Sequence, residues 1–218
     1  MYRPQRSQSL AAMPRRADPQ HSADERLVNR RATLGAEPKG RGGVGKLNEQ
    51  LAREAAATGI RRAVETGTLM GDSAIKLAHI FSRVETIELS PNYALRSWFR
   101  LRRYRNVRLR FGDSSKLLRP ATEPTLYWLD GHWSAGNTAG AHRQCPLLDD
   151  LCATSPGTAR DWYLIDDARL FTGSLDPVLD PAQWPTVDEI RAVLAELRPS
   201  HRVSVHEHLD LIVVRPRA

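Results

Sequence analysis

VETGTLMGDS, residues 64–73, is the stretch of this 218-residue chain that most strongly indicates a fold. It joins a short apolar run to a helical pattern that begins at Asp72. Gly67 permits a tight turn and a close backbone approach to a ligand, and Gly71 lets the helix pack near the strand. The free N–H groups of that helix can receive an anionic group. An ordinary strand-to-helix turn is the alternative. The stretch lacks GxGxxG, which weakens a dinucleotide reading, and lacks GK[ST], which excludes a P-loop.

Working outward, strand and helix patterns alternate along most of the chain. The strands are expected at 62–66, 84–89, 107–111, 125–129, 162–165, 202–206 and 209–214, and the helices at 47–57, 72–80, 92–104, 115–118, 146–152 and 186–197. Such alternation favours a mostly parallel sheet with helices on both faces. The last two strands are joined by too few residues for a parallel crossover, so they should pair antiparallel. We therefore predict a Rossmann-like, doubly wound α/β fold whose seven-stranded sheet ends in an antiparallel hairpin.

Polar residues lie at the predicted carboxyl ends of the next two strands, where open parallel sheets bind ligands. Glu88 ends the second strand about twenty residues after the glycine loop, and an acid there can accept hydrogen bonds from both hydroxyls of a ribose. A surface glutamate is the alternative. Asp113 and Ser114 end the third strand and suit the edge of an adenine. The carboxyl ends of the first three strands thus carry, in chain order, residues suited to a nucleoside ligand. This ordered set indicates an adenosyl-binding site.

The motifs together resemble those of class I S-adenosylmethionine-dependent methyltransferases. VETGTLMGDS is similar to motif I of the catechol O-methyltransferase type, in which a bulky residue, here Leu69, replaces the middle glycine. TIELSPNYA (86–94) resembles the second-strand acid and its proline-led helix, and RFGDSSKLL (110–118) resembles the adenine loop. TLYWLDGHW (125–133) and YLIDDARLF (163–171) resemble the metal-bearing strand ends. The resemblance covers roughly residues 64–171.

This resemblance implies S-adenosylmethionine as the cofactor and methyl transfer, to an oxygen of a small molecule, as the reaction. Glu88 would hold the ribose, and Gly67 and Gly71 would line the methionine end. Asp113 and Ser114 would meet the adenine. The full set of residues expected to bind the cofactor is Glu65, Gly67, Thr68, Gly71, Ser73, Glu88, Asp113, Ser114 and Asp130.

Three carboxylates, Asp130, Asp166 and Asp167, end two strands that we expect to be neighbours. Carboxylate oxygens are hard ligands suited to Mg²⁺ or Ca²⁺. In the related O-methyltransferases the matching positions bind Mg²⁺, so the resemblance predicts Mg²⁺ here. Such an ion would lower the pKa of a bound hydroxyl. In the alternative reading Asp130 caps the following loop and Asp167 is solvated.

The chain departs from the catechol pattern at the general base. The family places a lysine three residues after the first metal aspartate, where this chain has Trp133, and no lysine follows Lys116. We predict that Asp130 and His132 are the catalytic residues, because His132 is the nearest group that titrates near neutral pH. A histidine that fills the loop or contacts the cofactor is the alternative, and His142 is a second candidate base.

Two arginine features and the substrate loop complete the predicted site. Arg169 could steer an anionic substrate or pair with Asp167. The run Arg96–Arg110 holds seven arginines and is read as a solvated helix face or as a contact for an acidic partner. The Gly- and Ala-rich loop Gly131–Arg143 should form the rim of the substrate pocket.

Composition divides the chain into two parts. Residues 1–45 have no sustained apolar period, so we predict a disordered basic tail, followed by a methyltransferase domain at 46–218. Residues 1–46 carry ten Lys/Arg against four Asp/Glu, and the remainder carries 22 against 21. The nearly neutral domain counts against nucleic acid as a partner. Cys145 and Cys152 are expected to be reduced thiols packed under a helix.

The absence of a signal peptide or membrane-length apolar run predicts a soluble, cytoplasmic protein with no membrane association. The expected partner is a small-molecule methyl acceptor; a homodimer is an option that the sequence leaves open. Two other functions also stay open. A nucleic-acid methyltransferase would use the tail and the arginine run. A binding protein that has lost catalysis would explain the missing lysine.

Overall fold

The computed structural model describes residues 47–134, 138–173 and 175–217. The predicted tail at 1–45 lies outside the described residues. In chain order the elements are α2 (Glu49–Ala57), β1 (Arg62–Thr66), α3 (Asp72–Ile80), β2 (Arg83–Glu88), α4 (Pro91–Leu101), β3 (Val107–Phe111), α5 (Ser114–Leu117), β4 (Thr125–Leu129), α6 (Leu147–Ala153), β5 (Trp162–Asp166), α7 (Ala168–Phe171), η1 (Pro181–Gln183), α8 (Val187–Leu197), β6 (His201–His206), η2 (Glu207–Leu209) and β7 (Leu211–Pro216).

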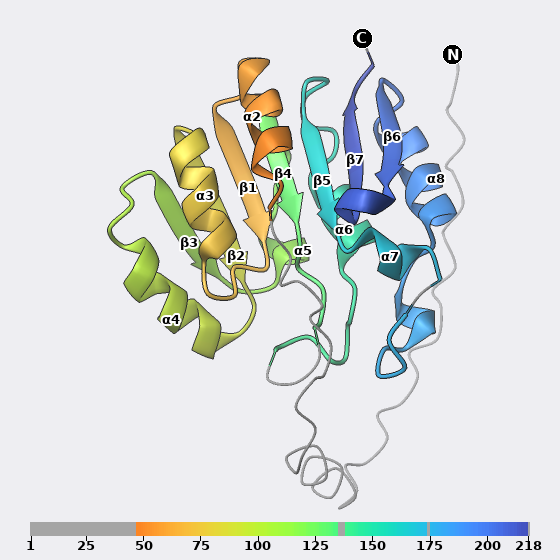
Figure 1. Cartoon of the computed structure of the whole chain (residues 1–218), viewed down its shortest axis with the longest axis horizontal. Coiled ribbons are helices and arrows are strands. Elements are labelled where there is room, and N and C mark those ends of the chain that lie inside the picture. Colours follow the sequence, from red (N-terminus) through yellow and green to blue (C-terminus); the bar gives the residue numbers. More distant parts are fainter. Residues whose placement is uncertain (1–46, 135–137, 174, 218) are drawn as a thin grey trace, which may run out of the picture. The chain divides into compact units, whose positions relative to one another are not determined.

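The seven strands form one sheet in the order β3-β2-β1-β4-β5-β7-β6. Strands β1 to β5 run parallel, whereas β7 is antiparallel to both β5 and β6. The short η2 turn between β6 and β7 explains the hairpin, because it is too short for a crossover. The predicted fold class is confirmed (Figure 1).

Helices cover both faces of the sheet (Figure 1), so the central strands are buried on both sides. Strand β4 shows how this works. Its side chains alternate, with Leu126 and Trp128 packing in the core beneath α2 and α3. Tyr127 and Leu129 point to the opposite core, which α6, α7 and α8 cover. Alternation between two buried faces gives the near-continuous apolar run that parallel strands show.

Several element ends differ from the sequence-based expectations by a few residues. Helix α2 starts at Glu49 because the side chain of Asn48 accepts a hydrogen bond from the Leu51 N–H (3.0 Å) and caps the helix. Helix α4 ends at Leu101, three residues earlier than predicted. Helix α7 and η1 were not predicted, since each is a single turn with little apolar periodicity.

Both cysteines are free thiols, as predicted, but their expected packing under a helix is wrong for one of them. Cys152 lies on the outer side of α6 and is exposed, while Cys145 precedes that helix and is partly buried. Among the described residues, no helix is long and apolar enough to cross a membrane.

Candidate active site

A cleft of about 440 Å³ opens at the carboxyl ends of β1, β2, β4 and β5. Strand order reverses between β1 and β4, and open α/β sheets bind ligands at such a switch point. Of the predicted site residues, the following line the cleft: Gly67, Glu88, Asp113, Ser114, Asp130, His132 and Asp167. The described part of the predicted substrate loop also lines it, from Gly131 to Ser134 and from Thr138 to Gly140, together with Arg143.

The loop between β1 and α3 is shaped by its two glycines. Gly67 adopts φ +81°, and a Cβ there would lie 2.1 Å from the backbone oxygen of Asp130. Gly71 adopts φ +82° at the N-cap of α3, where a Cβ would press on Leu101 of α4. Gly67 borders the cleft directly. Gly71, Thr68 and Ser73 do not line it, so their predicted contact with a cofactor stays a prediction.

Glu88 presents its carboxylate to the cleft at the end of β2 and is 7% exposed. Its Oε2 accepts a hydrogen bond from the Leu69 N–H (2.8 Å), and its Oε1 accepts one from the Ser90 N–H (2.7 Å). Each carboxylate oxygen has two lone pairs, so each can accept one further hydrogen bond. The backbone therefore fixes the orientation of Glu88 and leaves capacity for a diol ligand.

Glu65 lies behind the cleft at the end of β1 and is fully buried. Its Oε2 accepts a hydrogen bond from the Thr86 hydroxyl (2.5 Å), and the Thr68 hydroxyl lies 2.5 Å from that of Thr86. Burial, aided by the charge of Glu88, raises the pKa of Glu65 to about 8 despite the Thr86 hydrogen bond. Its Oε1 has no hydrogen-bond partner among the described residues.

The predicted adenine loop is held by a buried acid that the sequence analysis missed. The Ser114 hydroxyl donates to the carboxylate of Asp150 on α6, at 2.8 and 3.0 Å from its two oxygens. Asp113 caps α5 through Ser115 and pairs with Arg143 and Lys116. The only sequence hint for Asp150 is a doubled acid near a helix start, which is typical of exposed residues.

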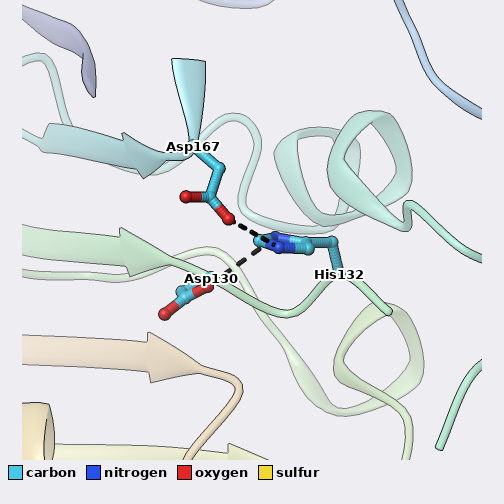
Figure 2. A group of neighbouring side chains, drawn as sticks. All are labelled: Asp130, His132 and Asp167. Carbon is cyan, nitrogen blue, oxygen red and sulfur yellow. Dashed lines mark ion pairs between the residues drawn. The ribbon is translucent and has the colours of Figure 1, made fainter. Parts of the chain in front are cut away.

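His132 sits between two carboxylates at the ends of β4 and β5 (Figure 2). Its Nε2 lies 2.9 Å from Asp167 Oδ2, and its Nδ1 lies 3.6 Å from Asp130 Oδ1. One ligand atom from each of the three residues falls within 4.8 Å of the others. The His132 ring also packs against Trp184, with 5.4 Å between ring centroids. His132, rather than Asp166, thus joins Asp130 and Asp167 in this group.

The two neighbouring acids of β5 have opposite environments. Burial and repulsion from Asp167 raise the pKa of Asp166 to about 6. Burial also opposes ionisation of Asp167, but hydrogen bonds and positive charge from His132 and Arg169 outweigh it and lower its pKa. Asp166 is 4% exposed, and its Oδ2 has no hydrogen-bond partner among the described residues.

The ionised form of the Asp130 side chain is electrostatically unfavourable at this position. Burial raises its pKa well above the usual range, and the negative charges of Asp166, Asp167 and Glu65 add to this. Crowded carboxylates of this kind call for a neutralising proton or cation. An Asp130 in this setting suits contact with a positively charged ligand.

The two remaining candidates from the sequence, Arg169 and His142, differ in whether they line the cleft. Arg169 lines the cleft but pairs with Asp167 (2.6 Å) and with Asp210, so its charge is already matched. His142 is exposed and does not line the cleft. The apolar wall formed by Leu170, Val178 and Leu179 was missed, because the segment after β5 has no regular pattern.

No family model matches the chain, and no curated protein matches it in sequence. Solved structures match it in fold. An S-adenosylhomocysteine-bound methyltransferase from Podospora anserina (PaMTH1) gives a TM-score of 0.57 at 16% identity, covering 94% of this chain and 100% of that one. A protein from Staphylococcus aureus that is provisionally described as a caffeoyl-CoA O-methyltransferase gives a TM-score of 0.55 at 13% identity, covering 91% of this chain and 93% of that one. The O-methyltransferase TomG from Streptomyces achromogenes, in complex with S-adenosylmethionine, gives 0.54 at 18% identity, covering 90% and 99%.

These matches confirm the fold of class I S-adenosylmethionine-dependent methyltransferases. O-methyltransferases are among the solved structures that share it. At these identities the likeness describes the fold, and the activity has to be argued from the cleft.

Proposed function

We propose that this protein is an S-adenosylmethionine-dependent methyltransferase that methylates an oxygen of a small molecule. The observation that carries the proposal is Glu88, a carboxylate fixed by two backbone N–H groups and facing the cleft at the strand end where such folds bind adenosine. The close approach of Gly67 to the Asp130 backbone also fits the cofactor, because Gly67 borders the cleft without a side chain that would fill it. When bound, S-adenosylmethionine supplies an electrophilic methyl group.

In this proposal the chain's own residues bind, orient and deprotonate. Glu88 accepts hydrogen bonds from the ribose hydroxyls, and Asp113 and Ser114 meet the adenine. Asp130 faces the positively charged end of the cofactor, which relieves its repulsion from neighbouring acids. The apolar wall around Leu170 and Leu179 excludes water from the reacting atoms.

His132 replaces the lysine base that the catechol pattern would place here. With its Nε2 proton directed at Asp167, its Nδ1 is left to accept the proton of the acceptor hydroxyl. The 3.6 Å separation from Asp130 Oδ1 is too long for a hydrogen bond and leaves Nδ1 available. A carboxylate that fixes the ring and tautomer of a histidine base is a recurrent catalytic arrangement.

Divalent-metal assistance, predicted from the sequence as Mg²⁺ at Asp130, Asp166 and Asp167, is an alternative use of this edge of the cleft, because His132 cannot ligate an ion through Nδ1 and accept a proton there at the same time. The residues that fit an ion are Asp130, His132 and Asp167. A donor set with one imidazole suits Mn²⁺, Fe²⁺ or Zn²⁺ as well as or better than Mg²⁺, which prefers oxygen. A bound ion would lower the pKa of the acceptor hydroxyl.

The cofactor site is tested by calorimetry with S-adenosylhomocysteine. Glu88→Ala should weaken binding by roughly 2–3 kcal/mol, because it removes a charged hydrogen-bonding partner. Glu196→Ala, on the exposed side of α8, serves as the control and should bind as wild type does. Wild-type protein that binds no S-adenosylhomocysteine would refute the proposed function.

The base is tested by release of S-adenosylhomocysteine on a panel of phenols and alcohols. His132→Ala should reduce turnover by roughly 10²–10⁴-fold, the usual contribution of a general base, with little change in cofactor affinity. His142→Ala is the matched control. Titration of both variants with Mn²⁺ and Mg²⁺ separates the roles of His132, since a ligand would lose metal binding and a pure base would not. Cofactor binding without turnover on any acceptor would instead favour a protein that has lost catalysis.

A further inference from the structure

Positive charge in the described part of the chain is concentrated in one segment. From Leu89 to Arg119 there are nine Lys/Arg and one acid, Asp113. Residues 47–88 and 120–217 together carry thirteen Lys/Arg against twenty Asp/Glu. The nearly neutral net charge of the domain, which counts against nucleic acid as a partner, therefore conceals a basic segment on an acidic body.

This segment forms α4, β3 and α5, and β3 is an edge strand of the sheet (Figure 1). Arg100 and Arg110 pair with Asp72 and Glu85. The other six arginines are exposed and form no ion pair with any residue in the described ranges; they are Arg96, Arg102, Arg103, Arg105, Arg108 and Arg119. Their charge is available to a partner.

The outer face of α4 is apolar, which is unusual for a helix of a monomeric protein. Leu95, Trp98 and Phe99 are 60%, 48% and 51% exposed, and they occupy one helical face at i, i+3 and i+4. Arg102, one turn further on, lies over both aromatic rings, at 5.8 and 5.5 Å from their centroids. Exposed apolar clusters bounded by charge mark interaction sites.

Charge argues against two occupants of this face. A second copy placed symmetrically on it would bring the unpaired arginines of both copies together. Residues 1–46 of the same chain carry ten Lys/Arg against four Asp/Glu, so they too would be repelled. The partner must be anionic and must also accept large apolar side chains.

Contrary to the sequence-based expectation of no membrane association, we propose that α4 is a docking surface for an anionic lipid bilayer. Leu95, Trp98 and Phe99 would enter the boundary between headgroups and acyl chains, while the flanking arginines contact lipid phosphates. A single-stranded nucleic acid fits less well, because the aliphatic Leu95 cannot stack on a base and Arg102 already covers both rings. The proposal is independent of the proposed methyl transfer.

The test is co-sedimentation of the full chain with vesicles of phosphatidylcholine, alone or with about one third phosphatidylglycerol. We expect binding to the anionic vesicles only, with a blue shift of the tryptophan emission that Trp98→Phe removes. Trp98→Ala/Phe99→Ala should weaken partitioning at least tenfold. Arg102→Gln/Arg103→Gln should weaken it by a similar factor, at about 1 kcal/mol per arginine.

Arg53→Gln/Arg191→Gln is the matched control, because both arginines are exposed and lie outside the basic segment. It should bind vesicles as wild type does, and thermal melting should show that all variants fold. Absence of wild-type binding to anionic vesicles would overturn the proposal. So would wild-type binding by the Trp98/Phe99 variant, which would assign the effect to residues 1–46. Binding to single-stranded RNA, lost in the same variants, without vesicle binding would make α4 a nucleic-acid surface instead.

Discussion

Glu65 is a buried acid, and ionisation of its carboxyl group destabilises the folded protein. It is fully buried, its Oε1 lacks a partner among the described residues, and its pKa is raised to about 8. A carboxyl group with a folded-state pKa above its unfolded value favours folding in its protonated form. The stabilisation is complete below about pH 4.5 and is lost as the pH rises through about 8.

This gives a prediction for Glu65→Gln, which mimics the protonated acid. At pH 5 the variant and wild type should unfold at similar temperatures. At pH 9 the variant should be more stable, by on the order of 4 kcal/mol at most, because wild type must then ionise a buried group or leave it protonated at a cost. Thermal unfolding of both proteins between pH 5 and pH 9 measures the gap. A constant gap across this range would show that Glu65 does not titrate there.

At the scale of elements, the loop between β1 and α3 is the feature that positions the cleft. It brings the end of β1 against the end of β4, where Gly67 has no room for a side chain. The same loop carries Leu69, whose N–H fixes Glu88 at the end of β2. This loop therefore holds three strand ends together, and its close approach to the Asp130 backbone needs a glycine at position 67.

Gly67→Ala should therefore destabilise the protein well beyond the cost of its positive φ. Gly173→Ala is the matched control, since Gly173 also has a positive φ (+98°) but the added Cβ has no atom of the described residues within 4 Å. The control should lose roughly 1–2 kcal/mol from backbone strain alone. Gly67→Ala should lose at least about 2 kcal/mol more, because its Cβ meets backbone atoms that cannot yield cheaply. Chemical denaturation of both variants measures the difference; equal losses would contradict this account of the loop.

At the scale of the whole molecule, the described residues 47–217 form two buried cores of their own. Removing residues 1–46 should therefore leave the melting temperature and the affinity for S-adenosylhomocysteine nearly unchanged. Those residues have too few apolar side chains to add a core of their own. Differential scanning calorimetry and titration of the truncated chain measure both quantities. A fall of many degrees would mean that the segment packs on the domain.

The basic segment is also a property of the whole molecule. Seven arginines between Arg96 and Arg110 are visible in the sequence, but their pairing is not. The structure divides them into two that meet carboxylates and five that do not. Only the fold shows that one of the unpaired arginines, Arg102, lies over the exposed rings of Trp98 and Phe99 on α4.

Residue patterns along the chain were enough to predict the alternation of strands and helices, the closing hairpin and the glycine loop. Strand and helix periods are local properties, and Gly67 and Gly71 stand where the chain turns between elements. The same patterns also predicted Glu88, Asp113, Ser114 and Asp130 at strand ends, and the parallel sheet brings all four to one cleft. The exact helix ends and the short helix α7 were not predicted, because local caps and single turns decide them.

Which acids meet at the site depends on the tertiary structure. Asp166 lies beside Asp130, whose pKa its charge helps to raise, but the ligand atoms that fall within 4.8 Å of one another belong to Asp130, His132 and Asp167. Asp167 adopts φ +55° just past the strand, and this left-handed turn aims its carboxylate at His132. The buried partners Asp150 and Trp184 reach Ser114 and His132 from elements distant in sequence. Such convergence depends on strand register and on turns between elements, which residue patterns along one segment cannot encode.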